Sequence, residues 1–242
     1  MATVLRNRRF LALILITAGF WLIQGQMYAS MPKYVLRIVG DSAMPEWYAN
    51  VNPLVVVLCV VPVTDVVRRL APITSIAIAV ALIPVSAAIM GFSASVGPMA
   101  AAIGIVAHTV TVAMVLGIAL QGFAECFLSP RYYEFASKQS PPGQEGLYMG
   151  YAHINTFFAW FAGFVLSGYL LDALCPDPAK LSAADQAKRL AALAGSGPML
   201  AAYARAHVIW WVLAGVGVLA FAALMILQRS ARGTPPVLTS AE

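Results

Sequence analysis

The sequence predicts an all-α membrane protein that crosses the bilayer six times. Of its 242 residues, 61% are hydrophobic and only 10% are charged, and the mean hydropathy is +0.81. A soluble domain usually carries about a quarter charged residues, so this chain would lack a polar surface in water. Charged residues are also absent from five long stretches, at 10–32, 47–64, 70–124, 146–171 and 206–228. A helix needs about 20 apolar residues to cross a bilayer, and each stretch is close to that length or longer.

Four of these stretches fit one crossing each, and the stretch 70–124 is long enough for two. Gly, Ser and Pro are frequent at 91–98, which predicts a turn between those two crossings. We therefore predict a single transmembrane domain over residues 1–242. Its helices are expected at about 10–29, 49–67, 72–91, 98–128, 145–171 and 206–228.

The segment 172–205 is expected to be a loop outside the cytoplasm. Within it, Ser182 followed by Asp185 is typical of a helix start, and Gly195 of a helix end, so the loop is expected to hold a short surface helix. In the fifth helix, small residues recur at Ala159, Gly163 and Ser167, a spacing that permits close packing against a neighbouring helix.

Basic residues near the helix ends predict the orientation. With a cytoplasmic N-terminus, the inside carries nine of them and the outside six. The inner set is Arg6, Arg8, Arg9, Arg68, Arg69, Arg131, Lys138, Arg229 and Arg232. We therefore expect both termini in the cytoplasm and the chain in the inner or plasma membrane. The N-terminal apolar stretch is longer than the core of a signal peptide, which favours a retained helix.

Several classes of protein are not indicated. The net charge of +5 does not predict nucleic-acid binding, because the basic residues flank apolar spans and form no continuous stripe. Cys59, Cys126 and Cys175 are too few and too scattered for a disulfide framework or a metal site. No motif of a metalloprotease or serine hydrolase is present. We expect no enzyme activity, no cofactor and no metal.

Ionisable residues inside a membrane are costly and are candidates for function. His108 is expected about ten residues into the fourth helix, near the bilayer centre, and Glu125 further along toward the cytoplasm. Gln121 is four residues from Glu125 and shares its face of the helix. His108 suits either a hydrogen-bonded structural role or a role in gating or proton relay, and for His153 the structural role is favoured.

Charged residues also follow the second helix. Asp65, Arg68 and Arg69 suit either a solvated loop end or a charged latch between helix ends.

Several stretches resemble the proton-coupled oligopeptide transporter family of the major facilitator superfamily. FWLIQGQ at 20–26 and WYANVNP at 47–53, followed by Pro62, are similar to its seventh and eighth helices. QGFAECFLSP at 121–130 is similar to its tenth-helix motif, and DVVRR at 65–69 resembles a degenerate loop motif of the superfamily. The resemblance covers roughly residues 8–171.

The resemblance implies the C-terminal six-helix half of a twelve-helix fold. It implies that Glu125 meets the amino group of a peptide, and that Asn52 and Trp21 line the cavity; a divergent transporter of another solute is the alternative. Gln24 and Gly25 stand where the family has acidic residues implicated in proton coupling. Gln24 and Gln121 complete the expected solute site, and Glu125 and His108 are the candidates for proton coupling.

The function expected from this resemblance is secondary active transport of a small solute by alternating access, with or without coupling to protons. Since the superfamily binds its solute between two halves, the chain is expected to be a fragment, to pair with a separate N-terminal half, or to pair with a second copy of itself. The alternative is a membrane scaffold or assembly partner that transports nothing.

Overall fold

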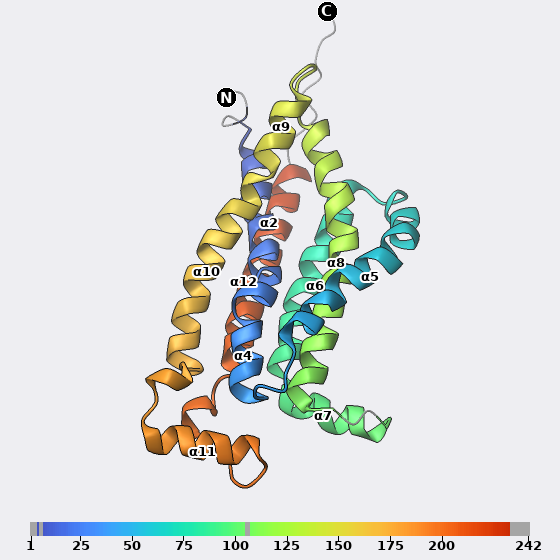
Figure 1. Ribbon diagram of the computed structural model, residues 1–242. Coiled ribbons are helices and arrows are strands. Elements are labelled where there is room, and N and C mark those ends of the chain that lie inside the picture. Colours follow the sequence, from blue (N-terminus) through green and yellow to red (C-terminus); the bar gives the residue numbers. More distant parts are fainter. Residues whose placement is uncertain (1–3, 5–6, 105–106, 233–242) are drawn as a thin grey trace, which may run out of the picture.

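The computed structural model describes residues 4, 7–104 and 107–232, and these residues form helices with no strand among them. Six helical spans are long and apolar enough to cross a membrane, which confirms the predicted all-α fold with six crossings. Figure 1 shows them as a bundle of long helices. The first residues of the first span and the last residues of the sixth lie at the same end of it.

The first crossing is interrupted. It consists of α2 (Arg8–Gln24) and α3 (Gln26–Ala29), which meet at Gly25, and the short α4 (Met31–Ile38) follows. The second and third crossings are α5 (Pro45–Val67) and α6 (Pro72–Gly91). Both begin with proline, whose missing N–H is not needed in a first helical turn.

The fourth crossing differs from its prediction. A helix was expected over 98–128, whereas the structure has a short α7 (Ser93–Ala102) and then a long α8 (Thr109–Lys138). Gly104 ends the first with a φ of +83°, and His108 caps the second, its ring nitrogen accepting a hydrogen bond from the N–H of Val110 at 3.3 Å. The sequence did not predict this break, because no charged residue occurs between 70 and 124 to mark it. The expected turn at 91–98 lies largely in α7, which points away from the bundle (Figure 1).

The remaining crossings are α9 (Glu145–Ala152) with α10 (Ile154–Leu174), and α12 (Val208–Arg232). Between them lie the short 3-10 helices η1 (Pro178–Lys180) and η2 (Ala201–Tyr203) and the surface helix α11 (Ala183–Leu193). The hydroxyl of Ser182 accepts a hydrogen bond from the N–H of Asp185, as expected of a helix start. The small residues Ala159, Gly163 and Ser167 are all buried on one face of α10.

Helix packing divides the bundle into two groups. α8 packs against α5 and α6, while α2 packs against α10 and α12, and contacts between α6 and α12 join the groups. The shared core includes Phe20, Ile83, Met90, Met114 and Trp210, all almost fully buried. α5 and the α9–α10 span are the least buried of the six spans, so each has a wide face that no other described part of the chain covers.

Candidate solute-binding site

The centre of the candidate site is a contact between the end of α2 and the middle of α8. The amide nitrogen Nε2 of Gln24 donates a hydrogen bond to Oε2 of Glu125 at 2.6 Å. Gln24 is buried, with 4% of its surface exposed, and Glu125 is half-buried. An ionised carboxylate only accepts hydrogen bonds, so the amide nitrogen of Gln24 must face it. Charge-assisted bonds of this kind are among the stronger ones in proteins.

This contact lies near the middle of the bundle. An α-helix rises about 1.5 Å per residue, so the 30 residues of α8 span roughly 45 Å and Glu125 lies about 24 Å from the first of them. A carboxylate at such depth in a bilayer is expensive unless it faces a polar or water-filled space.

Such a space is present. The Gln24–Glu125 pair borders a cavity of about 450 Å³ between α2, α3, α5, α8 and α10. Its lining consists of Trp21, Gln24, Gly25, Met27, Tyr28, Asn52, Glu125 and Trp160. The rings of Tyr28 and Trp160 lie 6.2 Å apart. The cavity thus combines one carboxylate with several aromatic side chains, and both attract cations.

Asn52 brings a further amide to this cavity from α5. It is 6% exposed, and its Nδ2 has no hydrogen-bond partner among the described residues. Gly122 on α8 permits its position, because a Cβ added at Gly122 would lie 2.8 Å from the carbonyl oxygen of Asn52 and 3.3 Å from its Nδ2. Oε1 of Gln24 is likewise buried and without a partner. Unpaired buried polar atoms are rare in proteins, and here two belong to residues of one cavity.

Polar contacts hold α10 against the first crossing on either side of the cavity. Asn155 donates to Thr17 at 3.1 Å, and Gln26 donates to the carbonyl oxygen of Gly163 at 3.2 Å. The hydroxyls of Ser30 and Ser167 are 2.8 Å apart. These bonds position the α10 face that carries Trp160.

The structure therefore brings together Trp21, Gln24, Asn52 and Glu125. Gln121 does not line the cavity: it is buried one turn before Glu125, and its Oε1 has no partner among the described residues. His108 was expected near the bilayer centre and is instead exposed at the start of α8. It lies 17 residues from Glu125, or about 25 Å along the helix.

The charged residues after α5 also lie apart from the cavity. Asp65 forms an ion pair with Arg68 at 2.7 Å, and Asp65, Arg68 and Arg69 are all exposed. No ion pair links these residues to another helix among the described residues.

Sequence reasoning missed four lining residues: Gly25, Met27, Tyr28 and Trp160. Gly25 marks the break between α2 and α3, and a Cβ there would lie 3.1 Å from the carbonyl oxygen of Trp21. Trp160 sits among Phe157, Phe158, Phe161 and Phe164 on an exposed face, and no local pattern distinguishes it from those neighbours.

Six apolar crossings around a mid-depth carboxylate, with aromatic side chains beside it, define a multi-pass membrane protein of the transporter class. A family model described as the POT family matches residues 5–177, and the chain belongs to that family. This is a peptide-transporter family of the major facilitator superfamily, as the resemblance of the individual stretches implied. The comparisons with curated proteins and with solved structures gave no match.

Proposed function

We propose that this chain supplies one wall of a proton-coupled transporter whose solutes carry an ammonium group, with short peptides as the class that the family suggests. The observation that carries the proposal is the mid-depth pair of Gln24 and Glu125 in an aromatic cavity. Intramembrane carboxylates mark solute or ion pathways. The family match supports a transporter.

The chemistry of the cavity suits a peptide. The carboxylate of Glu125 would bind the ammonium group, and the faces of Trp21 and Trp160 would add cation–π attraction. Nδ2 of Asn52 can donate to a carbonyl oxygen, and Oε1 of Gln24 can accept from an amide N–H. Because both atoms are buried, small side-chain movements would accompany binding.

Proton coupling would fall on Glu125. It is the only carboxylate among the residues lining the cavity, and Gln24 stands where the family carries an acid. A proton on Glu125 would neutralise the group that holds the ammonium, so that protonation and release of the solute would be linked.

We further propose that a second six-helix half, from a longer or separate chain or from a second copy, covers the cavity face during alternating access. α5 and α10, which border the cavity, are the least buried crossings. Leaving Glu125 exposed to lipid would be costly, so a protein surface across the cavity is the better neighbour.

Uptake of a labelled dipeptide into liposomes tests this function. The chain is reconstituted alone and together with a separately expressed N-terminal half of the same family, under an inward proton gradient. We expect uptake that collapses when the gradient is dissipated. Absence of uptake and of counterflow in both preparations would contradict transport and favour a membrane scaffold.

A further inference from the structure

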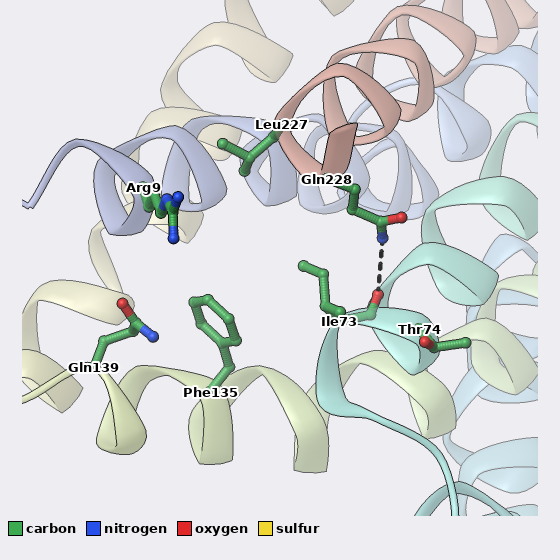
Figure 2. Close-up of a pocket in the computed structure, with 7 residues that line it drawn as sticks. All are labelled: Arg9, Ile73, Thr74, Phe135, Gln139, Leu227 and Gln228. Carbon is green, nitrogen blue, oxygen red and sulfur yellow. Dashed lines mark hydrogen bonds between the residues drawn. The ribbon is translucent and has the colours of Figure 1, made fainter. Parts of the chain in front are cut away.

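A second cavity lies at the end of the bundle where α2 begins and α12 ends. Its volume is about 290 Å³, and four helices enclose it, namely α2, α6, α8 and α12 (Figure 2). On α8 its lining residue Phe135 is ten residues beyond Glu125, or about 15 Å along the helix. It shares no lining residue with the solute cavity and has no role in the function proposed above.

One side of this cavity carries a cationic group, the guanidinium of Arg9. Figure 2 shows the guanidinium group of Arg9 pointing into the space above Phe135 and Gln139. Arg9 forms no ion pair among the described residues. The carboxylates at this end have other partners: Asp65 pairs with Arg68, Glu134 with Arg131 and Lys138, and Glu145 accepts from the N–H of Gly143. Arg9 is exposed, and its charge has no carboxylate partner in the part of the chain that the structure describes.

Neutral polar groups also line the cavity: Gln139 lies near the guanidinium, and Gln228 and Thr74 lie on the far side (Figure 2). Oε1 of Gln139 accepts a hydrogen bond from Nδ2 of Asn7 at 3.5 Å. The amide nitrogen of Gln139 is therefore left to donate to a ligand. Gln228 donates to the carbonyl oxygen of Ile73 at 3.4 Å, and Thr74 adds a hydroxyl. A ligand that fits these donors is an anion with several oxygen acceptors.

The apolar part of the cavity wall consists of Ile73, Phe135 and Leu227, and it leads toward the membrane interior. Leu227 lines this cavity and also a second hollow of about 420 Å³ between α2 and α12. Leu15 and Ile226 border that hollow with 62% and 66% of their surfaces exposed, and Ala12 and Ala223 keep it open. These residues belong to two membrane-spanning helices, so the hollow faces hydrocarbon.

We propose that this pair of hollows binds an anionic phospholipid of the surrounding bilayer. The phosphate lies against Arg9 and Gln139. One acyl chain passes Leu227 and occupies the second hollow, between α2 and α12, which we call the furrow. The position suits a lipid, since the cavity lies at the helix ends, where headgroups are found, and its apolar continuation runs toward the bilayer interior. Basic pockets between transmembrane helices are a known way of holding anionic headgroups.

Native mass spectrometry of the purified full chain with added phosphatidylglycerol tests the site. We expect at least one retained lipid, and about tenfold weaker retention for Arg9→Gln, because the variant loses a charge-assisted hydrogen bond to the phosphate. Arg8→Gln is the matched control, because Arg8 is an adjacent exposed arginine that does not line the cavity. Equal losses in both variants would show diffuse attraction and overturn the proposal.

The furrow has its own test. Ala223→Trp fills it, whereas Ala222→Trp adds the same group at an exposed neighbour outside it. We expect only the first to weaken retention of phosphatidylglycerol, with circular dichroism unchanged in both. Equal retention of phosphatidylcholine, or displacement of the lipid by millimolar inorganic phosphate, would contradict a site for anionic lipid.

Discussion

Gln24 and Glu125, 101 residues apart in the chain, are joined by a hydrogen bond of 2.6 Å near the middle of the bundle. The bond connects the end of α2 to α8, two helices from the two packing groups of the fold. It also fixes the direction in which the carboxylate faces the cavity. The proposed solute site depends on this contact.

Removing the donor should weaken the site. We expect Gln24→Leu to lower the apparent affinity for a dipeptide about tenfold, because Glu125 loses a charge-assisted hydrogen bond and its fixed direction. Concentration-dependent uptake measures the effect. The control is Gln121→Leu, which removes a buried glutamine that does not line the cavity. If both variants changed affinity equally, the pair would have no special role.

The close approach of α5 to α8 requires Gly122. We expect Gly122→Ala to cost about 1–3 kcal/mol of stability and to reduce solute binding, because the added Cβ would lie 2.8 Å from the carbonyl oxygen of Asn52. Thermal unfolding in detergent and binding measure these effects. Gly168→Ala on α10 is the control, since a Cβ there meets nothing within 4 Å. A fully stable, fully binding Gly122→Ala variant would show that the approach is not needed.

Arg189 attaches the surface helix α11 to the bundle. Its guanidinium donates to the carbonyl oxygens of Leu36 and Arg37 at 2.8 and 3.1 Å, at the end of α4. We expect Arg189→Ala to speed limited proteolysis within 172–205 several-fold, because both bonds to a buried charged group are lost. Lys188→Ala, which removes only an exposed pair with Asp185 at 3.6 Å, should have no measurable effect. Unchanged cleavage of Arg189→Ala would mean that other contacts hold α11.

Cys175 should make the protein less stable at high pH. Burial raises the pKa of its thiol from 9.0 to about 11. The folded state therefore favours the protonated thiol, and this contribution, at most about 2–3 kcal/mol, is complete below pH 9 and lost as pH rises through 11. Burial also raises the pKa of Tyr34, to about 12, so the wild-type curve alone does not isolate the thiol.

Comparison with Cys175→Ala isolates the contribution of the thiol to the pH dependence of stability. We expect the melting temperature of the wild type to fall more steeply between pH 9 and pH 11 than that of the variant, whose stability at pH 7 will be lower because of the lost side-chain volume. Parallel curves would show that the thiol does not titrate with folding.

The six crossings could be predicted because stretches without charge are a direct consequence of the hydrocarbon environment. The limits of α8 could not, because the uncharged run from 70 to 124 hides the break that Gly104 and His108 make. The error carried over to His108, which was expected deep in the membrane and lies exposed at a helix start.

The grouping of Trp21, Asn52 and Glu125 came from the family resemblance. Periodicity relates residues of one helix, and these three lie on three helices that meet only through tertiary packing. Gln121 was expected at the site because it shares a helix face with Glu125. It lies one turn earlier on α8, where it is buried and does not line the cavity. Trp160 could be found only once α10 was placed beside α2.

Proton-driven dipeptide uptake by Glu125→Gln tests the central claim most directly, with Glu145→Gln, which changes an exposed carboxylate at the start of α9, as the control. Both variants are reconstituted under the conditions that give uptake by the wild type. We predict that Glu125→Gln loses proton-dependent uptake and that Glu145→Gln retains it. If Glu125→Gln took up the dipeptide at the wild-type rate and with the wild-type pH dependence, Glu125 would not be the proton-coupling and solute-binding group.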